Sequence, residues 1–290
     1  RRTTRENIAD LVDEGTFVEY GPLVIAPQRR RHPVDYLIKR TPADGLVGGI
    51  GEVNGHLFEG HAKQVVAMSY DYTVLAGTQG GQNHRKKDRL FELAEQMRLP
   101  VVFFTEGGGG RPGDTDMMGV SGLDCLAFRY FAELSGLVPL VGVNAGYCFA
   151  GNAAILGCCD VVIATTGAID TLISEGKMLA GSRVELATSG IGACVRAGAA
   201  KPDISSVAAL KQTLLNAKSL AHSKVGQSGI HFAKVIEQLG IADAIRHKVT
   251  INASGLVAEL VVRGEVELGF QQTSELLAVK GIDLVGPLPD

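Results

Sequence analysis

The order of hydrophobic and polar positions predicts a mixed α/β protein. Short, continuous apolar runs are typical of strands buried on both faces. They alternate with longer segments whose apolar residues recur every three or four positions, as in amphipathic helices. In the first half we expect helices at 4–13, 83–97 and 122–135 and strands at 46–53, 56–60, 64–68, 100–105 and 138–143, followed by a turn, a helix and a buried strand within 144–164.

The pattern changes near residue 165, after which short helices and strands alternate regularly. Asp203, or one of Ser205 and Ser206, is a suitable N-cap for one helix, and Gly264 is a suitable stop for another. We therefore predict two domains, 1–165 and 166–290, the second being a separate α/β unit. Its expected helices are 207–218, 228–240 and 254–264, and its expected strands are 219–222, 249–252, 267–271 and 283–285.

Composition narrows the class of protein. The 290 residues are 46% hydrophobic, with a net charge of −3, so we expect no general affinity for nucleic acid. The 37 glycines indicate many turns and close backbone approaches. No apolar run reaches the roughly 18 residues of a membrane span, and the N-terminal residues have no apolar core of a secretion signal. The expectation is a soluble cytoplasmic protein without a membrane partner.

The cysteines do not form a metal-binding pattern. All five lie in apolar runs, and the adjacent pair Cys158–Cys159 lacks the spacing of zinc ligands. We expect buried, reduced thiols and no bound metal. The five are Cys125, Cys148, Cys158, Cys159 and Cys194.

Two glycine-containing segments are the candidates for chemistry. One strand, 101–104, runs into Gly107–Gly110, where no side chain blocks access to the backbone. A second, 140–143, leads to Phe149–Asn152 and a helix, whose first N–H groups have no partner within the helix. Such donors can converge on one oxyanion, each contributing roughly 3–4 kcal/mol to its stabilisation. The alternative is a flexible loop and a tightly packed turn without chemistry.

The same segments resemble a known family. NAGYCFAGNAAILGCCDVVIA is similar to the oxyanion segment of the crotonase-like superfamily, and EGGGGRPGD resembles the SGGAR loop of acyl-CoA carboxyltransferases. TPADGLVGGIGEVNG and YDYTVLAGTQGGQNHRKKDRLFELAEQMRLPVV extend the match over almost all of residues 1–165. This region resembles the acyl-CoA half of a biotin-dependent acyl-CoA carboxylase carboxyltransferase subunit, which implies a ClpP/crotonase ββα-spiral domain.

The resemblance implies a reaction and its donors. Gly108, Gly109 and Gly151 would hold a thioester enolate, with Gly107, Gly110 and Ala150 beside the substrate. Carboxylate would pass from carboxybiotin to the α-carbon of a short acyl-CoA, making the chain a carboxyltransferase. Hydratases of this superfamily have a catalytic glutamate where this chain has Ala154, so hydration is disfavoured.

Charged residues near the glycines have two interpretations. By the resemblance, Arg85, Lys86 and Lys87 lie where carboxyltransferases bind CoA phosphates; the alternative is an ordinary solvated helix face. We expect Glu106 and Asp114, which flank the glycine loop, to cap the backbone or pair with Arg111 rather than to act in catalysis.

The resemblance also implies partners. Biotin would arrive as carboxybiotin on a separate carrier protein, made by a biotin carboxylase, because the sequence has neither an ATP-grasp signature nor an AMKM-like biotinylation motif. In this family the active sites form between subunits, so a homo-oligomer is expected.

The second half departs from the carboxyltransferase pattern, since the expected biotin-side half is absent. Residues 168–290 resemble part of a molybdate-type solute-binding protein of ABC transporters, which implies a periplasmic-binding-protein lobe lacking the rest of its cleft. By that resemblance Ser223, Ser228, Gly229 and Gln271 would bind an anion; the alternative is that they are helix caps and strand ends. A natural fusion, a gene-prediction artefact, a designed chimera and a recombined sequence would all produce such a change, with a crossover within 160–163.

Three functions therefore compete. The first is carboxyl transfer to an acyl-CoA, with turnover by this chain alone in doubt. The second is solute or oxyanion binding by the C-terminal half, and the third is acyl-CoA binding by a crotonase-like domain that does not carboxylate.

Overall fold

The computed structural model divides into two compact units, residues 3–183 and 184–289, each with its own hydrophobic core. The structure describes residues 3–116, 126–224, 227–253 and 255–289. No described helix is long and apolar enough to cross a membrane.

A six-stranded sheet forms the centre of the first unit, in the order β1-β2-β3-β4-β6-β8. The first three strands in this order pair antiparallel, and β3, β4, β6 and β8 run parallel. The strands are β1 (Val18–Glu19), β2 (Leu46–Glu52), β3 (Gln64–Tyr70), β4 (Val101–Phe104), β6 (Leu140–Val143) and β8 (Val161–Ile163). A separate two-stranded ladder joins β5 (Gly107–Gly108) to β7 (Cys148–Phe149).

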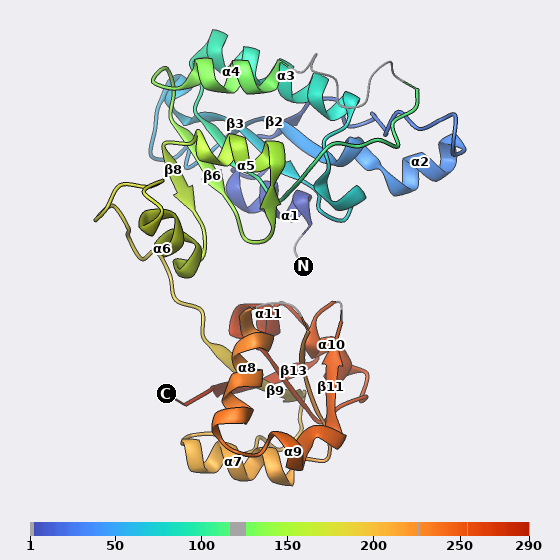
Figure 1. The fold of residues 1–290 in the computed structure, drawn as a ribbon, viewed down its shortest axis with the longest axis vertical. Helices are drawn as coiled ribbons and strands as arrows, with labels where there is room; N and C mark the ends of the chain where they lie inside the picture. The colour runs from blue at the N-terminus through green and yellow to red at the C-terminus, as the bar shows by residue number, and fades with distance from the viewer. Residues whose placement is uncertain (1–2, 117–125, 225–226, 254, 290) are drawn as a thin grey trace. The chain divides into compact units, whose positions relative to one another are not determined.

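Helices cover both faces of this sheet (Figure 1). α3 (Gly81–Met97) and α4 (Ala127–Leu134) pack on one face, around Phe91, Phe103 and Phe131, while α1 (Thr4–Leu11) covers the other. The approach of α3 requires a glycine in β2, because a Cβ at Gly48 would lie 2.7 Å from Leu90 Cδ1. The remaining helices are α2 (Val34–Arg40), α5 (Ala150–Gly157) and α6 (Thr166–Ser174), with 3₁₀ turns η1 (Pro42–Gly45), η2 (Gly60–Lys63) and η3 (Leu75–Gly77).

The second unit is a three-layer α/β structure around a five-stranded sheet of order β11-β10-β12-β9-β13. β10, β11 and β12 are parallel, whereas β9 runs antiparallel to both its neighbours. The strands are β9 (Ile191–Arg196), β10 (Leu220–Ser223), β11 (Val249–Asn252), β12 (Leu268–Gln272) and β13 (Ile282–Pro287).

Two hydrophobic cores lie on opposite faces of this second sheet. Phe232 and Leu214 belong to the core beneath α7 and α8, and Val261 and Leu276 belong to the core beneath α10 and α11. The helices are α7 (Val207–Asn216), α8 (Gln227–Gln238), α9 (Ala242–Ile245), α10 (Val257–Val262) and α11 (Thr273–Leu277), with the 3₁₀ turn η4 (Arg246–Lys248).

Most of the expected elements form, and the exceptions have physical reasons. Residues 56–60 are turns rather than a strand, since Gly60 has a φ of +58°. The strand at 161–163 is not buried, because β8 lies at the edge of its sheet and Val161 is 51% exposed. Among the elements that the sequence patterns missed are α2, α6, β9, α9 and α11. The start expected for one helix at 122 lies outside the described residues.

The cysteines are more accessible than expected. Cys194 is buried, but Cys158 is exposed and Cys148 and Cys159 are partly accessible. The prediction that all five are buried is therefore wrong, because α5 and β8 have one open side; Cys125 lies outside the described residues. Burial raises the pKa of Cys159 to about 12 and that of Cys194 to about 11, so both remain protonated thiols at neutral pH.

Candidate functional site

The two glycine-containing segments lie side by side. β5 and β7 pair in parallel, with Gly107 opposite Cys148 and Gly108 opposite Phe149. These residues follow β4 and β6, two adjacent parallel strands whose carboxyl ends meet at the same edge of the sheet. The chain thus brings the glycine loop next to the N-terminus of α5, as the sequence predicted from the two segments.

The glycine loop has a backbone that other residues rarely adopt. The φ angles are +94° at Gly107, +135° at Gly108 and +84° at Gly109. A Cβ at Gly108 would overlap the carbonyl oxygen of Phe149, whereas a Cβ at Gly109 would meet nothing closer than 3.6 Å. Glycine at these positions is a requirement of the turn and the close pairing, so the loop is not merely flexible.

The N–H groups of the loop have different uses. That of Gly107 donates to the carbonyl oxygen of Tyr147 at 2.6 Å. Gly107 therefore has a structural hydrogen bond, which leaves its N–H unavailable to a ligand. Gly110 is exposed and forms a β-bridge with Gln79.

The start of α5 supplies the second set of donors. Ala150 has a φ of +50°, a strained value for a residue with a Cβ, and no side chain caps the helix. The N–H groups of the first turn, including that of Gly151, therefore have no acceptor within the helix. A Cβ at Gly151 would lie 2.5 Å from Gln79 Nε2 and 2.7 Å from Phe128 Cζ, so a larger residue there would displace these two side chains.

A buried ion pair forms at Arg111, the residue that follows the glycine loop. The Arg111 guanidinium is paired with Asp44, and Asp114 Oδ2 lies 3.7 Å from Arg111 Nη1. Burial raises the pKa of Asp44, although Arg111 opposes the shift. The expected pairing of Arg111 thus forms with Asp114 but not with Glu106, whose half-buried carboxyl lies beside the turn at Gly146.

Two of the three cations proposed to meet CoA phosphates are buried. Lys86 is 6% exposed and its Nζ donates to the carbonyl oxygens of Ala43 and Leu46; Lys87 is fully buried. Burial lowers the pKa of Lys86 to about 8. For Lys86 and Lys87 neither a contact with CoA phosphates nor a solvated helix face fits, because the inner face of α3 turns both lysines into the unit. Arg85 is exposed and stays a candidate for a phosphate contact.

Sequence reasoning missed two amides of the site. Asn152 is fully buried and its Nδ2 donates to the carbonyl oxygen of Glu106 at 3.2 Å. Its Oδ1 accepts a hydrogen bond of 2.5 Å from Gln79 Nε2. The available signal was one polar side chain within the apolar run FAGNAAILG.

In the second unit, three of the four residues proposed for anion binding form a close group. Ser223 ends β10 and Ser228 lies in the first turn of α8, and their hydroxyl oxygens are 3.4 Å apart. A Cβ at Gly229 would overlap the carbonyl oxygen of Ser223, so only glycine fits there. On the neighbouring strand, Gln271 follows Phe270, the register partner of His222, and its Oε1 accepts the N–H of Val257 at 2.7 Å.

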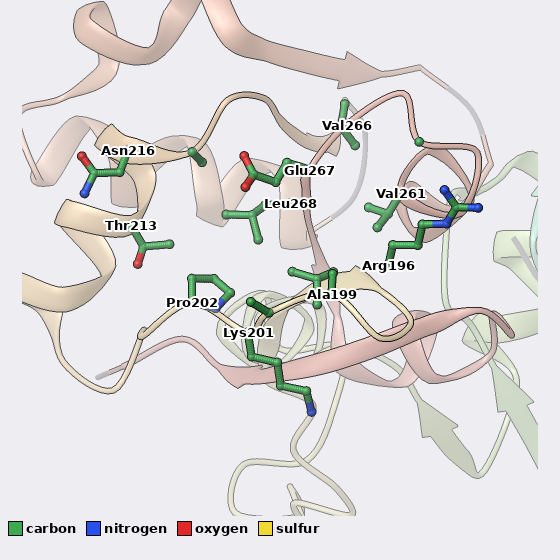
Figure 2. Close-up of a pocket in the computed structure, with 14 residues that line it drawn as sticks. Arg196, Ala199, Lys201, Pro202, Thr213, Asn216, Val261, Val266, Glu267 and Leu268 are labelled. Carbon is green, nitrogen blue, oxygen red and sulfur yellow. The ribbon is translucent and has the colours of Figure 1, made fainter.

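The second unit also has a hollow of about 550 Å³, which is not lined by the four residues proposed for anion binding (Figure 2). It is lined by Arg196, Lys201 and Glu267 among others, and Glu267 Oε2 already accepts the N–H of Lys218 at 2.5 Å. The Lys201 ammonium points away from the other labelled residues (Figure 2). Within the described residues, no group of three or more His, Cys, Asp or Glu is placed to hold a metal ion.

Family comparisons match the two halves separately. The model of the carboxyl transferase domain matches residues 1–189, and that of bacterial extracellular solute-binding proteins matches residues 152–290. Both resemblances found in the sequence are thereby confirmed. The two matches overlap at residues 152–189. The division between the two compact units falls in the sequence between residues 183 and 184. The domain boundary expected at residue 165 stays a prediction.

Individual relatives each match part of this chain. An aconitate isomerase of a Pseudomonas species is 42% identical over 132 residues, which is 45% of this chain and 50% of that protein. The methylmalonyl-CoA carboxyltransferase 12S subunit of Propionibacterium freudenreichii is 31% identical over 168 residues, 57% of this chain and 29% of that protein. The chain thus spans half or less of the length of these relatives.

A solved structure supports the fold of the carboxyltransferase region. A single-chain, multi-domain long-chain acyl-CoA carboxylase is 56% identical, with a TM-score of 0.54, and the match covers 62% of this chain and 18% of that one. The mixed α/β fold expected from the sequence is confirmed.

Proposed function

Because this chain belongs to the carboxyl transferase domain family, we propose that residues 3–183 bind a short acyl-CoA and stabilise the enolate oxygen of its thioester. The donors would be the backbone N–H groups of Gly108, Gly109 and Gly151. Arg85 is the exposed cation available for a CoA phosphate. The parallel pairing of β5 with β7 supports this proposal, because it places both donor loops side by side.

These donors would act by preorganisation. Loss of the α-proton places negative charge on the thioester oxygen, and fixed N–H groups in a partly buried site stabilise that charge without having to reorient. Gly108 is buried, and the Phe149 ring lies beside Gly109. Each donor would lower the barrier by roughly 3 kcal/mol or more.

Biotin supplies and accepts carboxylate in this family. The described residues contain one ladder of the β5–β7 kind, and the second unit has a sheet of different order. They do not fit a biotin site, because the thioester would use the single pair of loops. We therefore derive no step through carboxybiotin. The proposal is that transfer of carboxylate requires a biotin site outside the described residues, together with a biotin carrier and a biotin carboxylase.

Calorimetric titration of the whole chain with propionyl-CoA and with CoA tests this function. We expect propionyl-CoA to bind more tightly than CoA, since only the thioester has the carbonyl oxygen. Gly108→Val should abolish that difference, because its side chain would overlap Phe149. Failure of the wild-type chain to bind propionyl-CoA would contradict the proposal.

A milder variant separates the loop from general stability. Gly109→Ala has room for its Cβ but keeps a φ of +84°, which costs roughly 1–2 kcal/mol in an L-residue. Gly136→Ala is the matched control, with a φ of +77° and open space at the Cβ. Only the first variant should weaken binding of propionyl-CoA.

The second unit favours another candidate function, binding of a small carboxylate. Its specific support is the group formed by Ser223, Ser228 and Gly229 at the N-terminus of α8, beside Gln271. One relative acts, by its name, on aconitate. Titration with aconitate and with molybdate tests this candidate; no heat from either anion would contradict it, and Ser228→Ala should weaken any binding observed.

A further inference from the structure

Gln79 contacts both donor loops at once. Its backbone N–H donates to the carbonyl oxygen of Gly109 at 2.8 Å, and its side-chain amide packs against the Cα of Gly151. The residue is only 4% exposed and precedes α3, an element outside both loops. The position of its side chain therefore affects the distance between the two sets of donors.

A directed series of hydrogen bonds fixes the orientation of this amide. Lys87 Nζ donates to Gln79 Oε1 at 3.2 Å, Gln79 Nε2 donates to Asn152 Oδ1 at 2.5 Å, and Asn152 Nδ2 donates to the Glu106 carbonyl oxygen at 3.2 Å. An ammonium group only donates, so it holds the oxygen of Gln79 towards itself. The Gln79 NH₂ must then face Asn152, and the Asn152 NH₂ must face Glu106.

The last two residues of this series lie in the two loops. Glu106 is the residue before Gly107, and Asn152 is the residue after Gly151. We propose that Gln79, oriented by Lys87, is a positioning residue that holds the two donor loops at the spacing needed for one thioester oxygen. This inference rests on the proposed function and adds to it a group that touches neither substrate nor reacting atoms.

The variant Gln79→Glu separates a positioning role from a purely structural one, because a structural role predicts no selective loss of thioester binding. Gln79→Glu keeps the shape of the side chain and adds an ion pair with Lys87, so the first unit should remain folded. The new carboxylate, however, has no hydrogen to donate to Asn152. Asn152 must turn its NH₂ towards residue 79, which points its oxygen at the Glu106 carbonyl oxygen and removes the last bond of the series.

The test compares ligand affinity with folding stability in the whole chain. For Gln79→Glu we expect affinity for propionyl-CoA to fall about tenfold or more, with affinity for CoA and the unfolding temperature unchanged. Gln96→Glu is the matched control, because it makes the same change at an exposed position of α3. It should bind both ligands like the wild type.

The results for the variant and for the wild type separate the inference from the proposed function. Wild-type affinity of Gln79→Glu for propionyl-CoA would overturn the inference and leave the proposed function intact, whereas a wild-type chain that does not bind would overturn the function itself. If Gln79→Glu fails to fold, Asn152→Asp serves in its place: it still accepts from Gln79 but presents an oxygen to Glu106. An equal loss of propionyl-CoA and CoA affinity in that variant would also overturn the inference.

Discussion

Residues in unfavourable states cluster around the glycine loops of the first unit. Ala150 has a left-handed backbone, and Lys86, Lys87 and Arg111 place charged groups in the interior. Each is costly alone, and each is held by specific partners, such as the carbonyl oxygens that accept from Lys86. Such states are common at functional sites, where surrounding structure over-determines the geometry.

His84 gives this cluster a dependence on pH. Burial, followed by the charges of Lys87 and Arg111, lowers its pKa from 6.5 to about 3. The folded state therefore keeps the ring neutral while the unfolded state takes up a proton below pH 6.5. Stability is fully present above that pH and is lost as the pH falls towards 3.

We expect this histidine to cost about 2 kcal/mol of folding stability between pH 7 and pH 5. Urea unfolding of the wild type and of His84→Gln at both pH values measures the effect. The wild type should lose about 2 kcal/mol more than the variant over that interval. Equal losses would show that the ring is protonated in the folded state.

At the scale of elements, function depends on which strand ends become neighbours. β4 and β6 are far apart in sequence but adjacent and parallel in the sheet, so the loops that follow them meet. The same principle gathers Ser223 and Gln271 at the ends of β10 and β12 in the second unit. In both units the proposed site lies at the carboxyl ends of parallel strands.

The N-cap of helix α7 allows the contribution of a single capping residue to stability to be measured. Ser206 Oγ accepts the N–H of Ala209 at 3.2 Å, and the serine lies on the surface. Ser206→Ala should lower the stability of the second unit by about 1 kcal/mol, whereas Ser206→Asp should preserve it. Urea unfolding followed by circular dichroism measures both; an unchanged midpoint for Ser206→Ala would show that the cap does not contribute.

The whole molecule consists of two units with separate cores. A cavity made in one core should therefore affect one unfolding transition. Leu214 and Leu90 are both fully buried, one in each unit, and provide a matched pair.

Calorimetric unfolding should resolve two transitions. Leu214→Ala should destabilise one of them by about 2–5 kcal/mol and leave the other in place, and Leu90→Ala should do the reverse. A shift of both transitions by either substitution would show that the two units unfold as one.

The sequence by itself determined the mixed α/β class, most strand positions and both family resemblances, because apolar periodicity and glycine motifs are local signals. Gly108 and Gly151 could be proposed in this way, since both lie in segments that the motifs mark. The strand expected at 56–60 failed and β9 was missed, because neither segment has a distinctive local pattern.

Tertiary structure alone decided which charged and polar residues face inwards. Lys86 and Lys87 look like surface cations in sequence, but the packing of α3 on its sheet buries them. The contacts of Gln79 with Gly109 and Asn152 join segments remote in the chain, so no local pattern encodes them. Residue types determined what the loops can donate, and long-range packing determined where those donors meet.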